Sequence, residues 1–364
     1  MQPLPYETVT GDGVLLRPPR PGDADALVAA SADPLIERYV PALPSPLRPD
    51  DAAAWIASAL APAERRDLVI ADPSTDRLLG TCRLYHLSTT DRSGEIGYWV
   101  AAWARGQRLA ARATVVLTDW AFRHGLGRLE LLARPDNPAS QRVALAAGYR
   151  WEGRRRRAEL GRNGARHDLV AFARLAGDPP GPARRLLPDL PGGRLSDGVV
   201  ELRPLGPADA ADVAVQRALP EVTASTVGGT DPARSAVLCA EAAGEWLAGQ
   251  VARMTIRDTS TGAFAGELGL FQLEPLTGQA MIGYDLAPAW RGRGYATRAV
   301  RLVARWAFRS AGLARLIAGT TPDNVASQRV LERAGFQREG YQRSRLPGPD
   351  GTRLDDVLYA LLPE

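Results

Sequence analysis

Apolar and polar positions follow the same order in two long stretches of the chain. Each stretch contains short apolar segments bounded by turn residues, a pattern that favours β-strands. The segments at 95–100 and 281–286 lead through a Gly/Arg-rich turn into long patterns with helical spacing, at 107–124 and 293–311. Strands interleaved with helices in this way predict an α+β (α/β) fold, in which a mostly antiparallel mixed sheet is flanked by helices.

The two stretches also match letter by letter. IGYWVAAWARGQRLAARA (96–113) matches IGYDLAPAWRGRGYATRA (282–299), and PDNPASQRVALAAGYRWEG matches PDNVASQRVLERAGFQREG. A repeat unit of this length is a whole domain and not a solenoid repeat. The Pro/Gly-rich segment 177–193 between the copies is typical of a linker. We therefore expect one domain at 1–176 and a second at 194–364.

The composition is that of a globular protein. Of the 364 residues, 45% are hydrophobic and 24% are charged, which excludes a disordered chain. No apolar run reaches the length of a membrane span, and the first residues lack the pattern of a secretory signal, so a cytoplasmic protein is expected. Two distant cysteines and three histidines show no metal-ligand spacing, so we expect no metal site.

The basic residues narrow the choice of ligands. The chain contains no lysine, so all 45 basic residues are arginines, and a phosphate-binding P-loop, whose motif requires lysine, is excluded. The net charge of +4 and the pI near 9.3 are mild for this length. They suit an anionic ligand and do not require nucleic acid, which we regard as an improbable partner.

The Gly/Arg-rich turn of the second copy is the most informative segment. Its glycines let the main chain turn tightly, and the free N–H groups of the following helix, with the helix dipole, form an anion site suited to a pyrophosphate. A dinucleotide-binding motif would need a third glycine and an acidic residue about twenty positions later, and both are missing. The residues of this turn and helix start are Arg291, Gly292, Arg293, Gly294, Tyr295, Ala296 and Thr297.

This turn, followed by PDNxAS and a GF/GY…EG segment, resembles the GNAT N-acetyltransferases. The resemblance is strongest to the Rim-type branch, which acetylates ribosomal-protein N-termini and also includes acetyltransferases for antibiotics and other small molecules. It covers both copies nearly end to end. It implies acetyl-CoA as co-substrate and, as acceptor, a primary amine of a small molecule or of a protein N-terminus.

The resemblance also implies roles for single residues. The turn amides would hold the CoA pyrophosphate, and the strand before the turn would bond the pantetheine arm through Tyr284, Asp285 and Leu286. Asn324 and Ser327 would lie beside the thiol, where the serine can protonate the leaving thiolate. The matching cofactor residues of the first copy are Arg105, Gly106, Ala110 and Asn137.

The first copy departs from the family pattern at one position. Arg108 stands where the family has the internal glycine of the turn. A Cβ there restricts the φ angle and the approach of a ligand, so we predict weaker acetyl-CoA binding by the first domain. Asn137 and Ser140 are retained, although both also suit a helix cap.

Attack on a thioester requires a neutral amine, so a base must remove a proton. Glu95, at the start of the strand before the turn, occupies a suitable position in the first copy, where the second copy has Met281. Asp285 is predicted to face the same side as Met281, because strand residues alternate. Glu267 on the preceding strand is a third candidate, and the sequence does not choose among them.

Two other functions stay open. The chain could bind or sense acyl-CoA without turnover, or its arginine-rich surface could direct acetylation to nucleic-acid-associated targets. The segments expected to line the acceptor sites, 31–50 and 217–235, differ between the copies. The two acceptor sites are therefore predicted to be non-equivalent.

Overall fold

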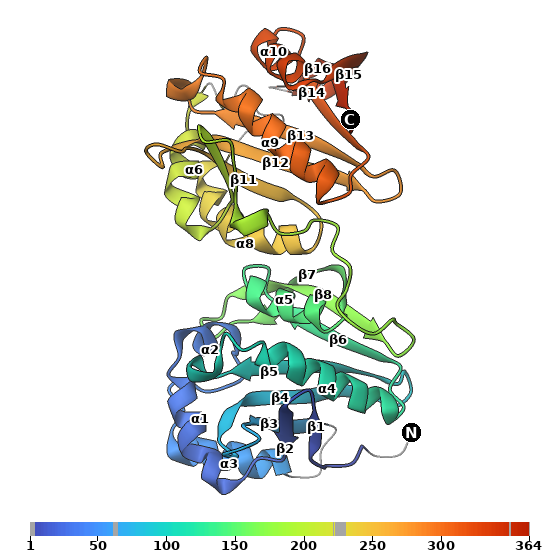
Figure 1. Ribbon diagram of the computed structural model, residues 1–364. Coiled ribbons are helices and arrows are strands. Elements are labelled where there is room, and N and C mark those ends of the chain that lie inside the picture. Colours follow the sequence, from blue (N-terminus) through green and yellow to red (C-terminus); the bar gives the residue numbers. More distant parts are fainter. Residues whose placement is uncertain (1–3, 61–64, 221, 223–230, 349–350, 364) are drawn as a thin grey trace. The chain divides into compact units, whose positions relative to one another are not determined.

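The computed structural model describes residues 4–60, 65–220, 222, 231–348 and 351–363 (Figure 1). The chain divides into two compact units, Met1–Arg184 and Arg185–Glu364, hereafter domain one and domain two. The division falls inside the segment 177–193 that the sequence indicates as a linker. Among the described residues, no helix combines the length and the apolar character needed to cross a bilayer.

Domain one is an eight-stranded sheet with helices packed on it. The strand order is β1-β2-β3-β4-β5-β6-β8-β7, and only the β5–β6 pair is parallel. This confirms the predicted mostly antiparallel mixed sheet. Its elements are β1 (Val9–Gly11), β2 (Val14–Arg17), α1 (Ala24–Ser31), α2 (Pro34–Tyr39), α3 (Pro49–Leu60), β3 (Arg66–Ala71), β4 (Leu78–Ser88), β5 (Ser93–Val100), α4 (Leu109–Arg123), β6 (Arg128–Ala133), α5 (Pro138–Ala146), β7 (Arg150–Leu160) and β8 (Arg166–Leu175).

Domain two repeats this topology. Its sheet has the order β15-β16-β14-β13-β12-β11-β10-β9, with β13–β14 as the parallel pair. Its elements are β9 (Leu195–Ser196), β10 (Val200–Pro204), α6 (Ala210–Arg217), α8 (Ser235–Leu247), β11 (Ala252–Asp258), β12 (Phe264–Glu274), β13 (Gln279–Leu286), α9 (Tyr295–Arg309), β14 (Arg315–Thr320), α10 (Val325–Ala334), β15 (Gln337–Pro347) and β16 (Arg353–Leu361).

Each sheet separates two packed layers. In domain two, Met254 and Leu268 belong to the core cluster that α9 covers. Strand side chains alternate between faces, so Thr255 and Glu267 point to the opposite face, where Arg217 of α6 contacts Glu267. In domain one the equivalent second layer is an apolar cluster contributed by α1, α2 and α3 together with β3 and β5.

The predicted linker is partly packed. Leu187 and Leu190 are buried in the core of domain two, and the indole N–H of Trp246 donates to the carbonyl of Pro188 at 3.0 Å. Prolines and glycines made this segment look like a free connector, but its two leucines supply enough apolar surface to dock it.

Candidate functional site

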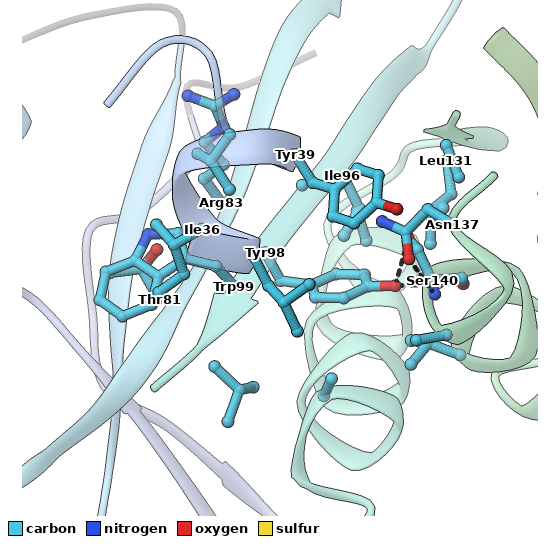
Figure 2. Close-up of a pocket in the computed structure, with 18 of the residues that line it drawn as sticks. Ile36, Tyr39, Thr81, Arg83, Ile96, Tyr98, Trp99, Leu131, Asn137 and Ser140 are labelled. Atoms are coloured by element: carbon cyan, nitrogen blue, oxygen red, sulfur yellow. Dashed lines mark hydrogen bonds between the residues drawn. The ribbon is translucent and has the colours of Figure 1, made fainter. Parts of the chain in front are cut away.

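The parallel strands of each sheet separate after a short paired stretch. Pairing of β5 with β6 ends at Glu95, opposite Glu130, and pairing of β13 with β14 ends at Met281, opposite Ile317. Beyond these points the main chain of β5 and β13 has no partner strand on that edge. In domain one a cavity of about 650 Å³ opens there (Figure 2).

The cavity of domain one brings together residues that are distant in sequence. Its lining includes the predicted cofactor residues Arg105, Gly106, Ala110 and Asn137, the predicted base Glu95, and also Thr81, Tyr98, Trp99, Ser140 and Glu159. Tyr98 and Trp99 are adjacent in β5 and face opposite sides of the sheet. The cavity therefore passes through the opening between the separated strands.

The Gly/Arg turn has the same main-chain shape in both domains. Gly294 is left-handed, with φ 79° and ψ 4°, and Arg108 adopts φ 56° and ψ 20° at the same position. A Cβ placed on Gly294 would meet no atom within 4 Å. A non-glycine residue in this region is strained by about 1–2 kcal/mol, but the turn keeps its path. The domains thus differ here in a side chain and not in the main chain.

The first arginine of each turn ties the turn to the preceding strand. Arg105 donates from Nε to the carbonyl of Val100 at 3.2 Å, and Arg291 donates to Leu286 at 3.1 Å. Arg105 also holds Asp33, at the start of α2, through two contacts of 3.0 Å. Both guanidiniums therefore contact protein carbonyls.

The other predicted turn residues of domain two have separate surroundings. Arg293 lies over the ring of Trp290 at 5.4 Å. Tyr295 is buried, and its hydroxyl donates to Asp258. Ala296 and Thr297 belong to the first turn of α9, where the main-chain N–H groups have no carbonyl partner within the helix.

A tyrosine–serine contact spans the opening in each domain. The hydroxyls of Tyr98 and Ser140 are 2.8 Å apart (Figure 2). Those of Tyr284 and Ser327 are 3.0 Å apart. The preceding asparagines are helix caps, since Asn137 and Asn324 each accept the serine N–H at 3.1 Å.

Burial keeps both phenols neutral. It raises the pKa of Tyr284 to about 12 and that of Tyr98 well above its usual range. The sequence analysis did not predict the contact of these tyrosines with the serines. The signal that the sequence offered was the recurrence of tyrosine and serine at matching positions of both copies.

Glu95 belongs to a polar cluster that domain two lacks. Its carboxylate accepts the Tyr85 hydroxyl and lies 3.1 Å from Nδ1 of His86. Arg83 lies over the Tyr85 ring at 4.3 Å. Glu95 is 9% exposed. In domain two, Met281 stands in place of Glu95 and Phe271 in place of Tyr85. Gln272 stands in place of His86, and Gly269 in place of Arg83.

Glu159 is a cavity residue that the sequence did not reveal. It lies on β7, contacts Nε of Arg134, and lines the cavity with Ser140. Leu346 holds the equivalent place in the register of domain two. Glu159 follows a run of arginines and is distant in sequence from the turn, so only the absence of a carboxylate in the second copy could have drawn attention to it.

Domain two places both of its predicted carboxylates side by side. Asp285 and Glu267 are register partners on β13 and β12. Arg217 holds Glu267 through contacts of 3.1 and 3.2 Å. Burial, reinforced by the charge of Glu267, raises the pKa of Asp285 to about 7, while Arg217 and Arg291 oppose the rise. Asp285 is thus poised to exchange a proton near neutral pH.

A mixed sheet that opens at its parallel pair, with a Gly/Arg turn leading into a helix at the mouth, is the architecture of acetyltransferases that use coenzyme A. The chain belongs to the GNAT acetyltransferase family, because the acetyltransferase (GNAT) domain model matches residues 14–150 and again 200–337. Members of this family take their acetyl group from acetyl-CoA. The tandem architecture indicated by the repeat is confirmed.

Individual relatives cover one domain each. The probable N-acetyltransferase YjcK of Bacillus subtilis (strain 168) is 45% identical over 98 residues, which are 27% of this chain and 54% of the relative. The ribosomal-protein-serine acetyltransferase of Escherichia coli (strain K12) is 33% identical over 101 residues, 28% of this chain and 56% of the relative. The chain thus spans about half the length of these relatives.

Among solved structures, Mycobacterium smegmatis RimJ in complex with CoA-disulfide is 30% identical. That match covers 46% of this chain and 84% of the other, with a TM-score of 0.42.

Proposed function

We propose that the chain transfers the acetyl group of acetyl-CoA to a primary amine of a small molecule or of a protein N-terminus. The observation that carries this proposal is the cavity of domain one, where the anion-binding turn, the Tyr98–Ser140 contact and the carboxylate of Glu95 meet. Relatives named as ribosomal-protein acetyltransferases favour a protein amine among the acceptors.

The described residues fit acetyl-CoA in each domain. The main-chain N–H groups at Gly292–Ala296 would hold the pyrophosphate, because they lie at the positive end of α9. The main chain of Tyr284–Leu286 lacks a partner strand on one edge and would bond the pantetheine amides. Asn324 and Ser327 would lie beside the thiol of CoA. In domain one the corresponding groups belong to Arg105, Gly106, Ala110, Asn137 and Ser140.

The reaction needs a base that removes a proton from the attacking amine and a donor that protonates the departing thiolate. In domain one, Glu95 removes a proton from the ammonium, the amine attacks the thioester carbon, and the C–S bond breaks. The thiolate takes a proton from Ser140, whose hydroxyl faces Tyr98, and the second proton that the nitrogen loses as the amide forms restores the serine hydroxyl. In domain two, Asp285 acts as the base, since Glu267 is occupied by Arg217, and Ser327 is the proton donor.

Thiol release from acetyl-CoA with a panel of amines tests this proposal on the full chain. We expect Glu95→Gln to abolish acetylation of the acceptors of domain one and Ser327→Ala to lower turnover in domain two by about 10²- to 10⁴-fold. Acetyl-CoA binding without amine-dependent thiol release would instead support a protein that senses acyl-CoA. Full turnover by Ser327→Ala under conditions where chemistry is rate-limiting would leave this serine a helix residue only.

A further inference from the structure

Domain two has a row of four polar side chains, three buried and one half-buried, at positions where domain one is mostly apolar. Thr255, Glu267 and Asp285 lie side by side across β11, β12 and β13. Gln216 precedes Arg217 on the buried face of α6. We call Gln216, Thr255, Glu267 and Asp285 the polar row.

The strand register, together with the matching positions of α1 and α6, identifies the counterparts of the polar row in domain one. They are Ala30, Val69, Thr81 and Trp99, and three of these, Ala30, Val69 and Trp99, pack in a single core cluster. Since the domains share one topology, the positions of the polar row are also neighbours in space. Thr81 and Trp99 line the cavity of domain one, so Glu267 and Asp285 lie at the equivalent opening of domain two, with Thr255 beside Glu267.

The polar row has unused hydrogen-bonding capacity. Within the described part of the chain, no partner is found for either polar atom of the Gln216 side chain, for Oγ1 of Thr255, or for Oδ1 of Asp285. Gln216 is 2% exposed and Thr255 is fully buried. Buried polar groups without partners destabilise a fold, and domain one shows that this fold accepts apolar residues at these positions. The row is therefore better explained by a ligand than by packing.

We propose that the polar row is the acceptor-binding site of domain two and selects a primary ammonium whose neighbouring atoms carry hydroxyl or amide groups. The inference rests on the proposed function. Asp285 and Tyr284 are adjacent in β13 and face opposite sides of the sheet, and Tyr284 holds Ser327, so an ammonium at the free oxygen of Asp285 would face the thiol end across the opening between the separated strands. Thr255 and Gln216 offer both donors and acceptors to the neighbouring groups of the ligand.

The same chemistry rejects apolar amines. A hydrocarbon next to the ammonium would leave Thr255 and Gln216 buried and unpaired, and sites built for hydrogen bonding discriminate strongly against such analogues. In domain one, Val69 and Trp99 replace these groups. The two domains would thus acetylate different classes of amine.

Calorimetric titration of the full chain without acetyl-CoA tests the site independently of turnover. The probes are D-glucosamine, L-serinamide and, as an apolar amine, cyclohexylamine. We expect the polar amines to bind more tightly than cyclohexylamine, and Thr255→Val to weaken them about five- to tenfold through the loss of one hydrogen bond. Tighter binding of D-glucosamine would indicate a sugar-like acceptor, and tighter binding of L-serinamide would indicate a peptide-like acceptor.

Thr114→Val is the matched control. Thr114 is also fully buried with an unpartnered hydroxyl, but it lies in α4 of domain one. Both variants should keep or raise the melting temperature, and only Thr255→Val should change amine binding. Unchanged affinity in a folded Thr255→Val chain, or no preference of the wild type for polar amines, overturns the proposal. Selective binding without acetylation would overturn the proposed activity of domain two and leave the site intact.

Discussion

At the scale of single residues, the two domains carry their carboxylates at different points of the same strand. Domain one places Glu95 at the strand start, with Tyr85 and His86 around it. Domain two has Met281 there and Asp285 farther along, beside Glu267. Domain one therefore has Glu95 at its opening, and domain two has Asp285, each in different polar surroundings.

Asp285 should make the stability of domain two depend on pH. Its pKa rises from 3.8 to about 7 on folding, so the folded state binds the proton more tightly than the unfolded state. The free energy of unfolding should fall as the pH rises from about 4 to 7, by at most about 4 kcal/mol from this group. Asp285→Asn should reduce that fall, as seen by thermal unfolding at pH 5 and pH 8. Equal losses in both proteins would show that Asp285 is not perturbed by burial.

At the scale of elements, local sequence signals predicted the site-bearing segments well. The turn and the helix after it follow from glycines at left-handed positions, and α5 and α10 begin at the predicted caps Asn137 and Asn324. The fate of segment 177–193 was not predictable in this way. Prolines and glycines report local flexibility, whereas the burial of Leu187 depends on a surface that Trp246 and distant strands create.

Leu187 should be as important to domain two as a residue of its core. Leu187→Ala removes a fully buried side chain and should lower the free energy of unfolding by about 2–4 kcal/mol. The neighbouring Leu186 is 39% exposed, so Leu186→Ala is the control and should have a smaller effect. Denaturant unfolding of both variants makes the comparison. Equal, small effects would mean that the segment is a free linker after all.

At the scale of the whole molecule, the chain consists of two domains that share one fold and differ in side chains at the turn and in the second layer of the sheet. The prediction of unequal acetyl-CoA binding stays open, but its physical basis has changed. Arg108 leaves the turn intact, so any weakening in domain one must come from its side chain, which lines the cavity. The second layers of the two sheets differ more, since that of domain one is largely apolar and that of domain two carries the polar row.

Titration of the whole chain with CoA should therefore give one tight and one weaker site. Gly294→Asp should remove the tight site, because its carboxylate repels the phosphates, and Arg108→Gly should tighten the weak one. Melting curves check that both variants fold. Two equal sites in the wild type would mean that Arg108 points away from the phosphates or contacts them favourably. Loss of binding in Arg108→Gly would assign the arginine a direct role.

The sequence by itself determined the repeat, the mixed sheet and the position of the Gly/Arg turn. These features follow from periodicity and from glycines, which act over a few neighbouring residues. Only the tertiary structure revealed the Tyr85–Glu95–His86 cluster, the place of Glu159 in the cavity, and the polar row. These depend on strand register and on the burial of side chains from separate elements, which bring together residues such as Arg217 and Glu267 that no local pattern connects.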